Sequence, residues 1–366
     1  MRATSLEKLV DRKLAEQFCA VFAAEGAERF EASILQPADV LLDLYGEDIR
    51  ARAFITHDPV EGEMMLRPDF TVPVVLTHMQ GDGAPASYTY CGEVFRKQDD
   101  HPDRPSEFFQ VGFERFGGDD PAKADAEVFA LFSKQLAPYD LRAATGDIGI
   151  LVAAVRGLRT TQRRRAALLR HIWRPRRFRA LMNRFSQAGT ALRQQNLERV
   201  RSNLAQSDAP FIGFRTQSEI DARIAALEED AAEPAISTGE IELLDDILSL
   251  RETVPNVLSA LRDIAVDMPS IAEAVTRLSA RAGALDAAGI DIDTLDFETA
   301  FGRTSMEYYD GFVFGFFADA RPDLPPVATG GRYDAMTTVL GQGRGVPAVG
   351  GVLRPALLRQ LGGSVL

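Results

Sequence analysis

The sequence contains few cysteines and no long apolar run. Among its 366 residues there are two cysteines, Cys19 and Cys91, too few for a disulfide framework or a cysteine-based zinc site. No stretch approaches the roughly 20 uninterrupted apolar residues that a membrane-spanning helix needs. The first residues, MRATSLEKLVDRKLAEQF, lack the pattern of a signal peptide. We therefore expect a cytoplasmic protein with no membrane contact.

Charge is distributed unevenly along the chain. There are 53 Asp and Glu residues against 41 Lys and Arg, which gives a net charge of −12. Between Ile148 and Leu197 there is no Asp, Glu or Lys, whereas there are twelve arginines. The rest of the chain therefore carries a net charge of −24. The acidic total argues against indiscriminate binding of nucleic acids, and the arginine-rich segment is a candidate contact surface.

Six arginines of this segment recur at intervals of three, four or seven residues, which would place them on one helical face. They are Arg156, Arg159, Arg163, Arg170, Arg174 and Arg177. Pro175 weakens this interpretation, because a proline inside a helix kinks or ends it. Such a face could be solvated, could pair with the acidic residues of 219–246, or could contact a partner protein. We favour pairing or a partner protein over RNA.

Residue periodicity predicts an α+β fold. Thr4 and Glu7 fit a capping box at the start of a helix that ends near Gly26. Residues 87–96 and 107–117 have the composition of strands, and no crossover helix separates them, which predicts an antiparallel pair. Further predicted elements are a short helix near Gly46, a helix over 122–135, a strand over 141–149 and strands after residue 291.

The domain organisation is predicted from the long helical stretch in the middle of the chain. Residues 159–288 have apolar residues at mostly helical intervals, with Glu and Asp between them. We therefore predict one discontinuous α+β core, residues 1–158 and 291–366, interrupted by a helical arginine-rich insertion, residues 159–290. The sequence contains no internal repeat.

A polar face on the second predicted strand indicates a binding pocket. Gln110, Gly112 and Glu114 share one face, because side chains alternate along a strand. Burying such groups is costly unless they meet polar partners. Gly112 would leave room for a ligand beside the backbone, and Arg96 on the neighbouring strand could hold a phosphate or carboxylate bidentately. This pattern favours a small polar pocket over a solvent-exposed polar face.

Other motifs are weaker when each is read alone. The run Arg67–Thr71 predicts a turn into a helix with Asp69 or Thr71 as cap. The runs EYYDGFVF (307–314) and TGGRYD (329–334) are as typical of turns and core aromatics as of a site. GQGRG (341–345) lacks the spacing of a nucleotide-binding loop.

The acidic loop at 99–103 predicts a solvated turn rather than a metal site, because no second histidine is nearby. We also find no motif for nucleophilic or zinc chemistry in the sequence. We therefore expect neither a metal nor a cofactor.

Taken in order, LRPDFT, GEVFR with EFFQVGFE, EYYDGFVF and TGGRYD resemble the catalytic domain of histidyl-tRNA synthetases. The second of these resembles motif 2 of class II aminoacyl-tRNA synthetases. The fold that this resemblance implies is an antiparallel sheet flanked by helices, usually dimeric through the segment around Pro37.

The resemblance also implies a histidine-binding site. Eight residues of this sequence would form it, each by its match to a family motif. Asp69, Thr71 and Gln110 would face the α-amino group of histidine. Glu114 would read the imidazole together with Tyr308 or Tyr309. Tyr333 would close the pocket, and Arg96 would be the residue that in the synthetases holds the ATP α-phosphate and the amino-acid carboxylate.

Departures from the synthetase pattern change the implied function. Arg354, the match to the motif 3 arginine, is followed by only twelve residues, which leaves no room for an anticodon-binding domain. Leu353 and Gly315 stand where glutamates are expected, and Arg303 precedes Tyr308 by five residues rather than four. The residues that match the amino-acid site of the synthetases are present, whereas several that match their ATP site, and the domain that binds tRNA, are not.

This combination resembles the regulatory subunit of ATP phosphoribosyltransferase, a synthetase paralogue. The resemblance implies a chain that does not aminoacylate. It implies a homodimer within a hetero-oligomer with the short-form catalytic subunit, in the first step of histidine biosynthesis and under feedback by histidine. Two alternatives remain: a truncated synthetase-like amino-acid ligase that uses Arg96 and Arg303 or Arg354 on phosphate, and an RNA-binding protein that uses the arginine-rich segment.

Overall fold

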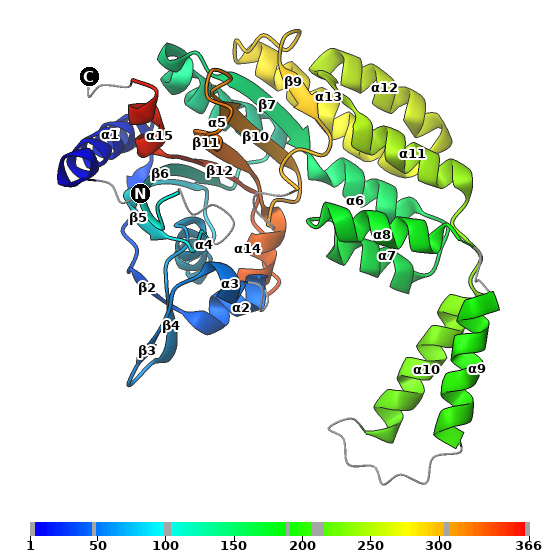
Figure 1. Ribbon diagram of the computed structural model, residues 1–366. Helices are drawn as coiled ribbons and strands as arrows, with labels where there is room; N and C mark the ends of the chain where they lie inside the picture. Colours follow the sequence, from blue (N-terminus) through cyan, green and yellow to red (C-terminus); the bar gives the residue numbers. More distant parts are fainter. Residues whose placement is uncertain are drawn as a thin grey trace.

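The computed structural model describes residues 4–45, 49–98, 104–187, 191–205, 216–303 and 308–362, and its centre is a large mixed sheet (Figure 1). The strand order in that sheet is β1-β5-β6-β12-β11-β10-β7-β9-β8. Neighbouring strands are antiparallel except in the pairs β1–β5 and β7–β9. Their bounds are β1 (Glu28–Arg29), β5 (Ala86–Phe95), β6 (Glu107–Phe116), β7 (Arg142–Asp147), β8 (Arg251–Thr253), β9 (Asp296–Glu298), β10 (Phe312–Phe317), β11 (Ala328–Arg332) and β12 (Ala348–Leu353). The α+β fold is confirmed.

The middle of this sheet is built from the last strands of the chain. β12, β11 and β10 lie between β6 and β7, which precede them by more than 150 residues. β12 pairs with β6 and β10 pairs with β7, both antiparallel. The first and last parts of the predicted core are therefore joined by continuous hydrogen bonding.

Helix α1 (Ser5–Ala24) packs on β5 and β6 through its apolar face. The predicted capping box is confirmed: Thr4 N donates to Glu7 Oε2 at 2.7 Å, and Glu7 N donates to Thr4 Oγ1 at 3.3 Å. Gly26, with φ +93°, follows the end of the helix as predicted. Two more helices border the sheet, namely α5 (Pro121–Leu136), which ends in the 3-10 turn η1 (Ala137–Tyr139), and α15 (Pro355–Gln360) beside α1.

A small three-stranded sheet with the order β2-β4-β3 lies beside the main one (Figure 1). Its strands are β2 (Leu35–Pro37), β3 (Ile55–Asp58) and β4 (Gly62–Leu66), and the helices near it are α2 (Ala38–Tyr45), α3 (Ile49–Arg52), α4 (Thr71–Gln80) and α14 (Asp334–Leu340). Strand β4 is absent from the elements predicted above. Gly46, the predicted end of α2, lies outside the described residues.

The middle of the chain is mostly helical, as the sequence predicts. Its helices are α6 (Ile148–Gly157), α7 (Gln162–Arg170), α8 (Pro175–Phe185), α9 (Ala191–Ala205), α10 (Gln217–Ala232), α11 (Thr238–Ser249), α12 (Val254–Asp267) and α13 (Ala272–Ala287), with the 3-10 turn η2 (Pro269–Ile271) before α13. Helices α9 and α10 form a hairpin that projects from the molecule (Figure 1). Two elements within residues 159–290 contact the core: β8 joins the main sheet and α13 packs on α5. The predicted domain boundaries at residues 158 and 291 stay a prediction.

The prediction that six arginines share one helical face is wrong. Helix α6 ends at Gly157, α7 ends at Arg170, and α8 begins at Pro175. The proline occupies the first turn of α8, where its missing N–H is not needed, so the segment is divided into separate helices. The arginines therefore lie on three helices and their connections.

Three arginines of the segment that are not among these six pair with the acidic stretch 219–246, so the pairing that we predicted for the face is found at other arginines of the segment. Arg164 is only 2% exposed, and its Nε donates to Asp230 Oδ1 at 2.7 Å. Arg184 Nη2 reaches the other oxygen of Asp230 at 3.1 Å, and Arg179 pairs with Asp245. These contacts tie α7 and α8 to α10 and α11. Among the described residues, every helix is too short or too polar to cross a membrane.

Candidate functional site

Glu114 is the centre of a buried polar cluster at the middle of the main sheet. It lies on β6 with 1% of its surface exposed. Its Oε1 accepts hydrogen bonds from Thr71 Oγ1 at 2.9 Å and Tyr90 OH at 2.8 Å, and its Oε2 accepts one from Tyr333 OH at 2.5 Å. Burial raises the pKa of Glu114 to about 7, although the three hydroxyls counteract part of this effect. The cluster is thus built from α4, β5, β6 and the residue before α14.

A glycine on the neighbouring strand makes room for this carboxylate. Gly350 on β12 pairs with Glu114, and a Cβ added there would lie 1.6 Å from Glu114 Oε2. No sequence motif described above includes Gly350. Only the register of β12 against β6 reveals it, because glycine is the one residue that permits so close an approach.

The space beside Gly112, which we predicted for a ligand, is filled by the protein itself. A Cβ on Gly112 would lie 2.3 Å from the hydroxyl oxygen of Tyr90. The Tyr90 ring also stacks on Phe70, with ring centroids 4.5 Å apart. Gly112 therefore accommodates an internal tyrosine, and that prediction is wrong.

Gln110 has no hydrogen-bond partner in the part of the chain that the structure describes. It is 0% exposed, and neither Nε2 nor Oε1 is bonded there. Because side chains alternate along a strand, Gln110 lies on the same face of β6 as Glu114. Leaving a buried amide unsatisfied costs roughly 1–3 kcal/mol. The unsatisfied amide therefore indicates that Gln110 binds a ligand.

Asp69 and Thr71 enter the cluster from the start of α4. Asp69 is 3% exposed, and its Oδ1 accepts a hydrogen bond from Val72 N at 3.3 Å. Its negative charge contributes to raising the pKa of Glu114, which places the two carboxyl groups near each other. Neither predicted residue is the N-cap, because Phe70 occupies that position without a side-chain cap bond and the Thr71 hydroxyl is directed to Glu114.

Three tyrosines form a wall of the cluster. The ring centroids of Tyr308 and Tyr309 are 4.7 Å apart, and those of Tyr308 and Tyr333 are 5.9 Å apart at an interplanar angle of 89°. A Cβ on Gly331 would lie 2.8 Å from the ring of Tyr309. The glycine pair in TGGRYD therefore makes room for aromatic packing.

Two arginines lie beside this wall. Arg354, directly after β12, donates to Pro326 O at 2.8 Å and to Thr329 Oγ1 at 3.3 Å. Burial and the nearby cation of Arg96 lower the pKa of Arg354 to about 10. Arg96 Nε donates to Pro68 O at 2.7 Å. Two guanidinium groups whose charges repel each other favour the binding of an anion.

Six of the eight predicted site residues therefore belong to the Glu114 cluster, namely Asp69, Thr71, Glu114, Tyr308, Tyr309 and Tyr333. Gln110 lies on the same face of β6, and Arg96 bonds to the residue before Asp69. Arg354, which we did not include among the histidine contacts, belongs with them. Arg303 does not. Its Nε donates to Ile172 O at 2.7 Å, its guanidinium lies 4.8 Å from the Phe178 ring, and burial lowers its pKa to about 10. Arg303 thus anchors the helical segment.

The arrangement is complementary to a free amino acid. Carboxylate and amide oxygens of Asp69, Gln110 and Glu114 suit an ammonium group and a ring N–H, whereas Arg96 and Arg354 suit a carboxylate. The part of the chain that is described contains no group of His, Cys, Asp and Glu arranged to hold a metal. The acidic loop at 99–103 lies outside it.

Comparison with known proteins identifies the family. The sequence model described as histidyl-tRNA synthetase matches residues 7–208 and 218–358. A protein of Mesorhizobium japonicum named ATP phosphoribosyltransferase regulatory subunit is 30% identical, over 92% of this chain and 94% of its own. A protein of Agrobacterium fabrum with the same name is 32% identical, over 90% of this chain and 91% of its own. The chain belongs to the family of ATP phosphoribosyltransferase regulatory subunits.

Solved structures agree with this family in their fold. A Bacillus halodurans protein described as an ATP phosphoribosyltransferase regulatory subunit/histidyl-tRNA synthetase has a TM-score of 0.68 at 20% identity, covering 99% of this chain and 81% of that one. A histidyl-tRNA synthetase of Nostoc has a TM-score of 0.64 at 15% identity, covering 97% and 72%. The chain therefore has the class II synthetase core that its sequence motifs imply.

Proposed function

We propose that this chain is a non-catalytic regulatory subunit of ATP phosphoribosyltransferase. It assembles with the short-form catalytic subunit, is required for the first step of histidine biosynthesis, and takes part in feedback by histidine. Similarity to regulatory subunits over about nine-tenths of both chains supports this role. The eight residues of the predicted site, with Arg354, form the histidine site.

The buried amide of Gln110 carries the assignment of the ligand. Its donor and acceptor atoms have no partner among the described residues, and it lies on the same face of β6 as Glu114. An α-amino group and a carboxylate are the groups that such an amide, with Asp69 and Arg96 nearby, can bind. Feedback then requires that histidine bind two states of the assembly with different affinity, with a coupling of about 1–3 kcal/mol.

The absence of ligase activity is the second part of the proposal. Leu353, fully buried in β12, stands where the synthetase pattern has a glutamate. Arg303, a candidate for holding phosphate, is bonded to the helical segment instead. A ligase would need these groups to stabilise charge on ATP.

Homodimerisation is supported by exposed apolar side chains around Pro37, the segment predicted to form the dimer. Ile34 and Leu35 close to it are 46% and 40% exposed. In the same small sheet, Ile55 on β3 and Val60 in the turn after β3 are 41% and 91% exposed. Large apolar side chains exposed on one small sheet are consistent with a contact to another protein.

The deciding experiment is co-expression with a short-form catalytic subunit, followed by assay of phosphoribosyl transfer with and without histidine. We expect activity only with both chains, inhibition by histidine, and loss of that inhibition in Gln110→Leu. Gln80→Leu, an exposed glutamine at the end of α4, is the control and should behave as wild type. Full activity of the catalytic chain alone would refute the regulatory role, and histidine-dependent ATP–pyrophosphate exchange by the pure chain would refute the non-catalytic one.

A further inference from the structure

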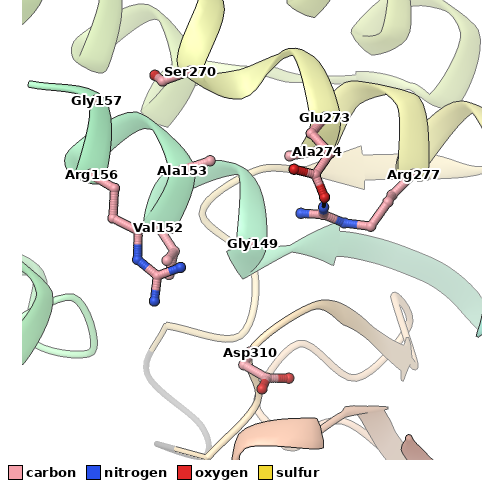
Figure 2. Close-up of a pocket in the computed structure, with 10 residues that line it drawn as sticks. All are labelled: Gly149, Val152, Ala153, Arg156, Gly157, Ser270, Glu273, Ala274, Arg277 and Asp310. Carbon is pink, nitrogen blue, oxygen red and sulfur yellow. Dashed lines mark hydrogen bonds and ion pairs between the residues drawn. The ribbon is translucent and has the colours of Figure 1, made fainter.

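A second polar site lies away from Glu114, where α6 meets the start of α13. It is a cavity of about 390 Å3, bordered by α6, η2, α13 and Asp310 (Figure 2). This volume is in the range of sites for small metabolites. The proposed histidine site does not include any residue of this cavity.

Two arginines enter the cavity from opposite sides (Figure 2). Arg156 comes from the end of α6, and Arg277 comes from α13. Arg277 Nη1 pairs with Glu273 Oε1 at 2.7 Å, in an exposed contact between residues one helical turn apart. Such exposed pairs contribute little, so a ligand anion can replace Glu273. Across the residues that the structure describes, no carboxylate pairs with the guanidinium of Arg156.

The wall between the two arginines is made of small residues. Gly149, Ala153 and Ala274 line it, so a ligand can approach the helix backbone closely. Ser270 is held against α6, because a Cβ on Gly157 would lie 2.1 Å from Ser270 Oγ. The Ser270 hydroxyl is thereby positioned at the edge of the cavity.

We propose that this cavity binds a small phosphate monoester that carries hydroxyl groups, such as a sugar phosphate. A phosphate monoester has a charge near −2 and three acceptor oxygens, which suffices for two guanidinium groups. A carboxylate has one charge and two oxygens, which suffices for only one guanidinium group. Ser270 and the carboxylate of Asp310 then meet the hydroxyl groups of the ligand.

Buried ion pairs connect this cavity with the Glu114 cluster. Asp147, directly before α6, accepts from Gly149 N at 2.8 Å and from Arg281 Nη1 at 2.8 Å. Arg281 Nε donates to Asp125 Oδ2 at 2.8 Å, and Arg332 Nη2 donates to Asp125 Oδ1 at 2.7 Å. The residue after Arg332 is the tyrosine that donates to Glu114. Groups at the two sites therefore belong to one contiguous network.

Asp310 provides a second connection. Its Oδ1 accepts from Asp334 N at 3.2 Å and its Oδ2 from Ala335 N at 2.5 Å, at the start of α14. The same helix follows Tyr333. We therefore expect occupancy of the cavity to change the affinity of the Glu114 cluster, and reciprocally. This coupling, unlike phosphate binding itself, rests on the proposed histidine site.

Calorimetric titration of the full chain with ribose 5-phosphate, ribose and inorganic phosphate tests the cavity. We expect ribose 5-phosphate to bind more tightly than either fragment. Arg156→Gln and Arg277→Gln should each weaken its binding about tenfold or more, which corresponds to about 1.4 kcal/mol. Arg163→Gln, an exposed arginine on α7, is the matched control and should bind as wild type.

Absence of ribose 5-phosphate binding at millimolar concentration would overturn the proposal, and so would equal binding by wild type and both cavity variants. Repeating the titration in saturating histidine tests the coupling: a shifted affinity supports it, and an unchanged affinity refutes it. If wild type fails to bind histidine, the proposed histidine site is refuted, while the titration with ribose 5-phosphate alone still decides the cavity.

Discussion

Tyr333 donates its hydroxyl hydrogen to Glu114 Oε2 at 2.5 Å, although 219 residues separate the two in the chain. Both side chains are almost fully buried. The bond joins β6 to the residue before α14, so the first and last parts of the α+β core meet at one carboxylate. Substitutions of this carboxylate should therefore change both the stability of the core and its affinity for the proposed ligand.

Stability should depend on pH through Glu114. Its pKa is about 7 in the folded chain against an ordinary value of 4.5, so the folded state binds more protons between these values than the unfolded state. The contribution of this group is thus full below pH 4.5 and is lost as pH rises through 7. We expect the difference in unfolding free energy between wild type and Glu114→Gln to fall by up to about 3 kcal/mol over this window. Urea titrations at several pH values measure it, and parallel curves for the two proteins would contradict it.

Gly350→Ala should destabilise the protein strongly. The new Cβ would overlap Glu114 Oε2 and would lie 2.7 Å from the backbone oxygen of Phe113, which cannot move alone. We expect a loss of about 2–4 kcal/mol in the free energy of unfolding. Gly283→Ala in α13 is the control, since nothing lies within 4 Å of its Cβ, and it should stabilise by up to about 1 kcal/mol. Equal effects of the two changes would show that β12 does not pack on Glu114.

Gln110→Leu should separate stability from binding. Replacing a buried, unbonded amide by an apolar side chain of similar size should raise the unfolding free energy of the ligand-free protein by about 1–3 kcal/mol. The same change should abolish binding of histidine in calorimetry, because the amide is the proposed contact. A variant that is less stable than wild type, or that still binds histidine, would argue against this assignment.

Arg164→Ala should destabilise the helical segment. The guanidinium also donates to Pro234 O and Asp230 O, both at 2.7 Å, so its loss leaves several buried acceptors without a donor. We expect a loss of about 3–5 kcal/mol, seen as faster hydrogen exchange in α7 and α10. Arg163→Ala at the neighbouring exposed position should change stability by less than about 0.5 kcal/mol. Unchanged exchange in Arg164→Ala would mean that packing alone holds these helices.

Features that depend on local sequence could be predicted. The capping box of Thr4 and Glu7 and the alternation around Gln110 and Glu114 each involve a few consecutive residues, and the structure contains them as expected. The resemblance to synthetases added the order of the site motifs. Together these gave the eight proposed site residues, whose role in binding histidine stays a prediction.

Features that depend on the register of distant segments could not be predicted. Tyr90 fills the space beside Gly112 because β5 and β6 pair in one register, and Gly350 opposes Glu114 because β12 pairs with β6. Arg303 lies close to the tyrosines in sequence, yet its guanidinium is directed to Phe178 on α8. Spacing along the chain does not contain this information.

The strand order has a consequence for the synthesis of the protein. β6 and β7 leave the ribosome early, but the strands that fill the space between them, β10 to β12, end only at Leu353. Until then two strand edges with apolar side chains have no partners, which is the situation in which nascent chains aggregate. The growing chain therefore depends on protection of these edges until β12 has been made.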